Sequence, residues 1–432
     1  MKKKFYSNFN RRQFLKRSIQ VAAISIVPRY VLGGKGYTAP SDVINLGFIG
    51  TGKQGKGLGD RFMKIQDCRI VANAEVDSKK RESFAGYIET YYSDTIGKSE
   101  VTQYVDYKEL LLREDIDAVV IATPDHWHAL NAIASMREGK DIFCEKPMAH
   151  TVWEGRRMVE VTRENDRVFQ TGSMQRSSFN FRRACELIRN GMIGEVKHIN
   201  VSVGDPAVYC DLPEEKTPDY LDWERWIGPA PMRPYNEILS PPIEQTHFPH
   251  WRKYWEFGGG GITDWGAHMY DIAQWALGMD DSGPIEFIPP KEDGATRGMK
   301  MKYANGTTMT HKDFGRGFGV EFLGSEGTIR VSRSFLEADP ANILEASIPS
   351  NGLHLFHSVN HYQDWLDAIK NRTKPICDVE IGHRTGSICN INNIAYTLKS
   401  DLKWNPEAEE ISGDKKAIKM LTKKYRKPYV VD

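Results

Sequence analysis

Short apolar segments alternate with longer amphipathic ones along the first part of the chain. The apolar segments, rich in β-branched residues, occupy residues 43–49, 68–77, 116–124, 141–148 and 168–174. Helix-like spacing of apolar positions occurs between them, at residues 126–139 and 151–166 among others. Strands that alternate with helices are typical of a parallel sheet with helices on both faces. The pattern therefore predicts an α/β domain over residues 43–170.

The pattern changes in the second part of the chain. Residues 205–257 are rich in Pro, Trp and Tyr and show little periodicity, which indicates a long loop insertion. Strand-like segments follow, with turn signals at Asn305-Gly306 and Glu326-Gly327, and helical spacing returns towards the C-terminus. We therefore expect a second domain over residues 171–432, built on an antiparallel sheet, whose last helices can pack back on the first domain.

The N-terminal 36 residues are basic and contain no acidic residue. Paired arginines, Arg11 and Arg12, precede Phe14-Leu15-Lys16 and a short apolar run from Val21 to Pro28. A bilayer-spanning helix needs about 20 apolar residues, so this run is too short for a stable span. It resembles a signal peptide of the twin-arginine type, which implies export to the periplasm; a basic arm without that role is the alternative.

Charge and cysteine content exclude other classes of protein. The 58 Lys/Arg and 57 Asp/Glu residues give a net charge of +1, and outside the basic N-terminus the chain is net acidic. Nucleic acid is therefore not an expected partner of the folded part. The six cysteines form no CxxC pair, so no zinc or redox motif is present and buried free thiols are expected.

A glycine-rich loop connects the first predicted strand to a helix. It follows a GxGxxG pattern, and an acidic residue, Glu75, ends the next strand. This context is typical of dinucleotide binding, because backbone amides at a helix start cradle a pyrophosphate. Glu75 is expected to bind ribose hydroxyls and to favour NAD over NADP; Asp77 is its competitor, and a tight turn without ligand is the alternative. The loop residues expected at the cofactor are Gly50, Gly52, Lys53, Gln54 and Gly55.

Two further strand ends carry polar residues. Thr123 and Pro124 follow the buried strand at 116–121, with His126 and His128 close behind. Because ligands bind at the carboxyl ends of parallel strands, we expect this loop to border the nicotinamide, although each histidine could equally serve packing or capping. Glu145 and Lys146 end the next strand, where a lysine can lower the pKa of a substrate hydroxyl; a surface lysine is the alternative.

Four glycines, 258–261, run directly into a segment with Asp264 and His268. A carboxylate and an imidazole four residues apart share one face of a helix. They could bind a metal or act as an acid/base pair beside a cofactor. No further cluster with metal-ligand spacing accompanies them, so we predict acid/base chemistry with no metal and with the glycines packed closely against the ligands. Asp271 is expected to be structural.

These motifs together resemble the Gfo/Idh/MocA oxidoreductase family. The GxGxxG loop, Glu145-Lys146-Pro147 and the GGGxxxDxGxHxxD segment occur in the family's order, from about residue 43 to the C-terminus. The resemblance implies a Rossmann domain, a second α/β domain with an open, mostly antiparallel sheet, and a dimer or tetramer. It matches Lys146 to the catalytic lysine and Asp264 and His268 to the acid/base pair, with His268 as the proton acceptor near its ordinary pKa.

Several weaker candidates for substrate contact remain. Arg176 follows the strand at 168–174, where the family places ligand contacts, but a surface role is equally compatible. Aromatic residues before the glycines could stack on a sugar or pack in a core or subunit interface. His383 could reach the site from a C-terminal helix. The low-weight substrate candidates are Arg176, Trp251, Arg252, Trp255 and His383.

The sequence as a whole predicts an exported NAD-dependent oxidoreductase acting on a sugar, cyclitol or sugar derivative. Because free NAD is scarce outside the cytoplasm, we expect the cofactor to be held tightly and regenerated within the cycle. Two alternatives stay open: a glycoside hydrolase or lyase that uses bound NAD to oxidise the sugar transiently, and a non-catalytic sugar-binding protein.

Overall fold

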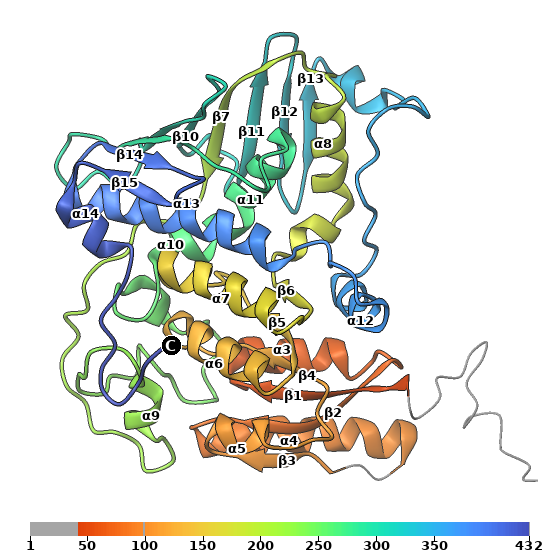
Figure 1. The fold of residues 1–432 in the computed structure, drawn as a ribbon, viewed down its shortest axis with the longest axis vertical. Coiled ribbons are helices and arrows are strands. Elements are labelled where there is room, and N and C mark those ends of the chain that lie inside the picture. Colours follow the sequence, from red (N-terminus) through yellow and green to blue (C-terminus); the bar gives the residue numbers. More distant parts are fainter. Residues whose placement is uncertain (1–41, 98–99, 432) are drawn as a thin grey trace, which may run out of the picture. The chain divides into compact units, whose positions relative to one another are not determined.

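The computed structural model describes residues 42–97 and 100–431. The predicted signal peptide over residues 1–36 lies outside these ranges, so export remains a prediction. Two sheets and their helices form one compact unit over residues 44–432 (Figure 1). In the described ranges, no helix is both long and apolar enough to cross a membrane.

The first sheet is parallel, as the alternating pattern predicts. Its strand order within the described chain is β3-β2-β1-β4-β5-β6, the arrangement of a Rossmann fold. Its central strands are buried on both faces, which explains their continuous apolar sequence. The strands are β1 (Ile44–Ile49), β2 (Cys68–Ala74), β3 (Thr102–Tyr104), β4 (Ala118–Ile121), β5 (Asp141–Cys144) and β6 (Phe169–Thr171).

Helices connect these strands and begin at identifiable caps. Asp77 caps one helix by accepting from the backbone N–H of Lys80, and Thr151 caps another by accepting from that of Glu154. The first helix has no such side-chain cap, which leaves its N-terminal amides available to a ligand. The helices are α3 (Lys53–Phe62), α4 (Ser78–Ile96), α5 (Tyr107–Leu111), α6 (Asp125–Arg137) and α7 (Val152–Glu164).

The second sheet is open and mostly antiparallel, as expected. Its order over the described residues is β13-β12-β11-β7-β10-β9-β8-β14-β15, and β7 and β10 form its parallel pair. Sequence patterns missed the short strands β13, β14 and β15. The strands are β7 (Val196–Ser202), β8 (Glu286–Ile288), β9 (Lys300–Lys302), β10 (Thr308–His311), β11 (Gly319–Gly324), β12 (Thr328–Val331), β13 (Leu336–Asp339), β14 (Leu402–Asn405) and β15 (Glu410–Ser412).

Three helices pack with this sheet around one apolar core: α8 (Phe179–Arg189), α11 (Gly266–Leu277) and α13 (Val379–Leu398). The insertion at 205–257 is mostly irregular, as predicted, and has its own small aromatic core. The remaining short helices are η2 (Met174–Ser177), α9 (Trp223–Ile227), η3 (His250–Lys253), α10 (Gly260–Asp264), η4 (Ala341–Glu345), α12 (His361–Asn371) and α14 (Lys415–Met420).

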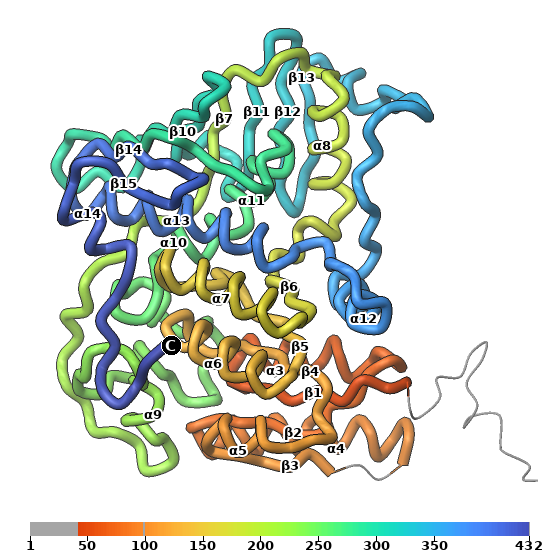
Figure 2. Tube along the Cα trace, in the orientation of Figure 1, coloured from red at the N-terminus to blue at the C-terminus, as the bar shows by residue number. Residues whose placement is uncertain are grey.

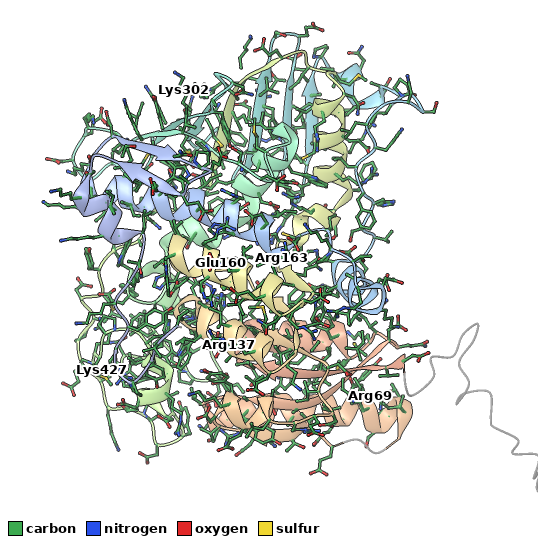
Figure 3. The ribbon with its side chains drawn as sticks, in the orientation of Figure 1. Arg69, Arg137, Glu160, Arg163, Lys302 and Lys427 are labelled. Carbon is green, nitrogen blue, oxygen red and sulfur yellow. The ribbon has the colours of Figure 1, made fainter. Side chains whose placement is uncertain are left out.

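Helices of the C-terminal part contact the Rossmann part. Trp365 of α12 is fully buried against Phe62 and Phe143. Helices α7 and α13 lie side by side, and Figure 3 labels Glu160 and Arg163 on α7. Arg163 pairs with Asp378, which caps α13, so a polar contact ties the two helices together.

The last residues of the chain run from α14 past α7 towards α6 and α9 (Figure 2). The backbone carbonyl of Leu421 accepts from the N–H of Trp153 at the start of α7 (3.0 Å). Arg426 donates to the carbonyl of Gly228, and the ring of Tyr429 packs edge-on against Trp127 (5.3 Å). We call residues 421–431 the tail; it joins the insertion to the Rossmann part.

Candidate active site

The GxGxxG loop has the backbone geometry that its glycines permit. Gly50 has a φ of 83°, and a Cβ there would lie 2.7 Å from the backbone nitrogen of Thr123. A Cβ on Gly55 would lie 2.2 Å from the carbonyl oxygen of Gly50, whereas a Cβ on Gly52 would meet open space. The first and third glycines thus allow close packing, and the second leaves room at the start of α3 for a phosphate.

The structure separates the two acidic candidates at the end of β2. Glu75 accepts from the backbone N–H groups of Thr51 (2.8 Å) and Asp77 (3.1 Å), which fixes its carboxylate beside the glycine loop. Asp77 instead caps α4 and pairs with Lys80 (3.0 Å). Glu75 is therefore the acid that faces the space in front of the loop.

A cavity of about 340 Å³ opens in front of the loop. Its lining includes the loop with Glu75, the turn at residues 105–108, the strand end at Ala122–Pro124, two residues of α6, the insertion and the tail. From the insertion it includes Trp226, Leu239, Ser240, Trp251 and Arg252, and from the tail Pro428 and Tyr429. The glycine loop, the uncapped α3 and this cavity together fit a dinucleotide. Lys53 and Gln54 line it as well.

Lys146 and Asp264 form a close, mostly buried ion pair. Lys146 Nζ donates to Asp264 Oδ1 (2.6 Å) and to the Asp264 backbone carbonyl (3.0 Å). Burial opposes ionisation of Asp264, but the Lys146 ammonium and the Arg252 guanidinium outweigh it and lower the pKa of Asp264 to about 2. Asp264 is therefore a fixed anion that holds the lysine in place.

The pair adjoins the cofactor cavity through two side chains. Gln54 of the loop donates to Glu145 Oε1 (2.7 Å), the residue before Lys146. Arg252, which lines the cavity, approaches Asp264 Oδ1 to 3.6 Å. A ligand bound in the cavity can thus extend to the lysine and the carboxylate.

One expectation about the glycine-rich segment is wrong. Asp264 and His268 do not share one helix, because α10 ends at Asp264 and α11 begins at Gly266. Two of the glycines pack closely within the protein: a Cβ on Gly260 would lie 2.6 Å from the backbone of Ala207, and one on Gly261 would lie 2.4 Å from Gly204. The glycines bring the backbone of 204–207 against the start of α10.

His268 is buried next to the lysine, but its pKa is not near the ordinary value. Burial, with the positive charges of Lys146 and Arg333, holds the pKa of His268 well below 6.5. Arg333 Nη2 lies 3.2 Å from His268 Nε2, and His268 Nδ1 is buried without a partner in the described chain. Asp264 does not orient the ring, since its partner is Lys146.

His126 and His128, the other histidines near the strand ends, contact backbone carbonyl groups and do not line the cavity. The ring nitrogens of His128 lie 2.9 Å from the carbonyls of Pro147 and Thr123, and burial lowers its pKa to about 4. His126 is buried between the carbonyls of Trp226 and Phe257. His128 therefore positions Thr123, whereas Thr123 itself lines the cavity.

Arg176 and His383, predicted as substrate contacts, lie in buried structural clusters. The Arg176 guanidinium is enclosed by Asp271 (2.7 Å) and Asp280 (2.7 Å), which confirms Asp271 as structural. His383 Nε2 contacts Glu409 (2.7 Å), which also pairs with Arg156 of α7. Both predictions failed because the acidic partners come from distant parts of the chain.

Of the two aromatic candidates, Trp251 lines the cavity and Trp255 does not. Trp251 lines the cavity, and Arg252 stacks on its ring at 4.3 Å. Trp255 faces the tail instead: its carbonyl accepts from Lys423 Nζ (2.6 Å), which also lies 5.2 Å over its ring. The tail thus anchors the segment that leads into the glycines.

Sequence patterns missed the part of the site that comes from the second sheet. Arg333 lies two residues after the end of β12, and Gln175 of η2 accepts from Arg333 Nε (3.1 Å) and donates to the carbonyl of His268 (3.2 Å). Trp265, between the two helices, packs on Phe318 (4.7 Å). An isolated arginine after a strand gives no sequence signal, so only the fold could identify it.

In the described part of the chain, neither the cysteines nor a cluster of metal-ligating residues forms part of the site. All six cysteines are free thiols, and all except Cys210 are buried. Among the described residues, no three metal-ligating side chains gather at one point.

The fold and site define a Rossmann-type protein in which a buried lysine–carboxylate pair and a histidine lie close to a cavity that fits a dinucleotide. Family models agree over most of the chain: residues 44–173 match the oxidoreductase family's NAD-binding Rossmann fold, and residues 207–431 match its C-terminal alpha/beta domain. The chain therefore belongs to the Gfo/Idh/MocA oxidoreductase family.

Individual relatives are more distant. A glycosyl hydrolase family 109 protein of Shewanella pealeana is 30% identical over 212 residues, a match that spans 44% of each protein. The fold is similar to myo-inositol 2-dehydrogenase of Lactobacillus plantarum (19% identity, TM-score 0.55, 84% of this chain and 99% of that one). It is also similar to an aldose-aldose oxidoreductase of Caulobacter crescentus (16% identity, TM-score 0.58, 84% and 99%).

Proposed function

We propose that this protein is an NAD-dependent oxidoreductase that acts on a hydroxyl of a sugar, cyclitol or sugar derivative. One observation carries the proposal: an ion-paired lysine and a neutral, buried histidine lie together, and Arg252 connects the ion pair to the dinucleotide cavity. A lysine held by a carboxylate and an uncharged imidazole are the groups needed to polarise a hydroxyl and accept its proton.

Each residue of the site has its own role in the proposed reaction. NAD, when bound, supplies the acceptor for the hydride that is released as a hydroxyl becomes a carbonyl. Lys146 donates a hydrogen bond to the substrate oxygen, and Asp264 keeps the ammonium in position. His268 accepts the hydroxyl proton at Nε2, because its contact with the Arg333 guanidinium leaves that nitrogen unprotonated.

Glu75 supports the preference for NAD over NADP. Its carboxylate is fixed by two backbone amides and lines the cavity. Ribose hydroxyls can donate to it, whereas a 2′-phosphate would be repelled.

The walls of the cavity support tight retention of the cofactor. The insertion and the tail contribute much of the lining, so a bound dinucleotide is covered by segments that are themselves packed on one another. Retention agrees with the predicted twin-arginine export to the periplasm, since that route carries folded proteins. We infer that the bound NAD is regenerated within the cycle, by a second sugar or by reversal of a transient oxidation.

A second candidate is NAD-assisted glycoside cleavage, in which transient sugar oxidation enables loss of the aglycone. The observation in its favour is the set of relatives named as glycosyl hydrolase family 109 proteins, each matched over less than half its length. The two candidates use the same lysine, histidine and cavity, so substrate assays must separate them.

The test begins with protein purified without added nucleotide. Denaturation and mass spectrometry are expected to release about one NAD per chain, and NAD should be needed for turnover of a panel of sugars and cyclitols. Aglycone release from aryl glycosides without net NADH would select the second candidate instead. Lys146→Met should keep the nucleotide and lose turnover, whereas Lys302→Met, at an exposed position of β9 (Figure 3), should change neither. A protein that binds no NAD would refute the proposal.

A further inference from the structure

Arg333 brings a positive charge without a direct ion pair to the proposed base, and the carboxylates of Asp264 and Glu145 act on it only from a longer distance. It lies two residues after the end of β12 in the second sheet, and its Nη2 lies 3.2 Å from His268 Nε2. Within residues 42–97 and 100–431, no carboxylate lies within ion-pair distance of it, whereas the nearby Arg176 is enclosed by two. The charge at Arg333 is thus open to a ligand.

The contact with Arg333 also decides the state of His268. A guanidinium has donors and no acceptor, so His268 Nε2 must be unprotonated and accept from it. The single ring proton then lies on Nδ1. Because Nε2 is the nitrogen that must take the substrate proton, Arg333 occupies the place that a substrate hydroxyl needs.

Neighbouring polar and aromatic groups hold Arg333 in place. Gln175 accepts from its Nε (3.1 Å), and its guanidinium stacks over Trp265 at 4.7 Å. Phe318, partly exposed, packs on Trp265. Aromatic faces of this kind stack on sugar rings, so a sugar that takes the place of Arg333 on the Trp265 ring would have its substituents beside the displaced guanidinium.

We propose that the substrate is an acidic sugar, with a carboxylate or sulfate that binds Arg333 and draws it away from His268. The inference rests on the proposed function and specifies its substrate. An anion forms a stronger, charge-assisted bond to a guanidinium than a neutral imidazole does, so such a substrate gains affinity and frees the base in the same event. A neutral sugar must displace Arg333 without this compensation.

The test compares matched neutral and acidic ligands on the NAD-loaded protein. The probes are methyl glucoside, methyl glucuronide, glucose 6-sulfate, and the pair inositol and inositol monosulfate, and the measurements are equilibrium dissociation constants and kcat/KM. We expect at least one acidic member to bind more tightly than its neutral counterpart. In Arg333→Gln that advantage should fall by about 30-fold, equivalent to about 2 kcal/mol, while Arg333→Lys retains part of it.

Controls separate this inference from the proposed function. Arg316→Gln removes an exposed charge that pairs with Glu337 on the same sheet, and it should leave the acid preference intact. NAD release and binding by each variant report the cofactor site independently of the sugar. The carboxylate and sulfate arms show which anion is preferred. If no acidic ligand outbinds its neutral counterpart, or if Arg333→Gln keeps the preference, the inference is wrong even where NAD binding holds.

Discussion

The ion pair between Lys146 and Asp264 gives a quantitative prediction. We consider Lys146→Met, Asp264→Asn and the double variant. Either single change leaves one charge without its partner in a site where the two side chains are only 15% and 24% exposed. The double variant removes both charges, so it should be less destabilised than the sum of the single variants.

The size of the effect follows from the geometry. Exposed pairs contribute about 0.2–1 kcal/mol, whereas loss of one partner from a fully buried pair costs about 3–5 kcal/mol. The Nζ–Oδ1 distance of 2.6 Å and the partial exposure place this pair between those limits. We therefore expect a coupling energy of about 2 kcal/mol, between those two limits.

The assay is urea unfolding of the four proteins at pH 7, followed by tryptophan fluorescence and far-ultraviolet circular dichroism, with coincident transitions required. Additivity of the single variants within about 0.5 kcal/mol would refute the reasoning, because non-interacting sites add. A pH series checks the same charge. Since the folded pKa of Asp264 is depressed, its stabilisation is present above pH 3.8 and lost as the pH falls through about 2, and Asp264→Asn should lack this component.

Four further predictions concern the cofactor and the base. Glu75→Gln should lower the ratio of NADP to NAD dissociation constants about tenfold, measured by fluorescence titration, because it removes the opposing charge; an unchanged ratio would exclude Glu75 as the selector. Gly55→Ala should abolish NAD binding in the same titration, whereas Gly57→Ala, with open space around its Cβ, should not. Because the pKa of His268 is held well below 6.5 by burial, kcat/KM should stay flat from pH 8 to about pH 6 and fall only at lower pH as the ring protonates; an acid limb centred at 6.5 or above would contradict this. Tyr429→Ala should speed NAD loss about tenfold in gel filtration, since the tail lines the cavity, and equal retention would show that the tail is not a cover.

Much of the fold was predictable from local pattern. The strands β1, β2, β4 and β5 are buried on both faces or nearly so, and their apolar runs appear in the sequence at the right places. Edge and hairpin strands of three or four residues, such as β3 and β13–β15, carry too few positions for a pattern to stand out.

The candidate site was predictable only where its residues belong to motifs. The GxGxxG loop and Lys146 lie where the sequence predicts, because strand ends and turns are encoded locally. The helix through Asp264 and His268 was wrong, since α10 ends between them and each residue takes a partner from elsewhere: Lys146 for one and Arg333 for the other.

The sequence by itself determined the Rossmann architecture, the dinucleotide loop and the residue types of the proposed acid/base centre. Periodicity and turn chemistry act over a few residues, so they can be read without the fold. Only the tertiary structure decided which charges meet. It enclosed Arg176 between Asp271 and Asp280, and it left Arg333 open beside His268, 65 residues away in the chain. Such pairings depend on how the sheets and helices pack, because burial and distance, rather than residue type, set the role of a charged side chain.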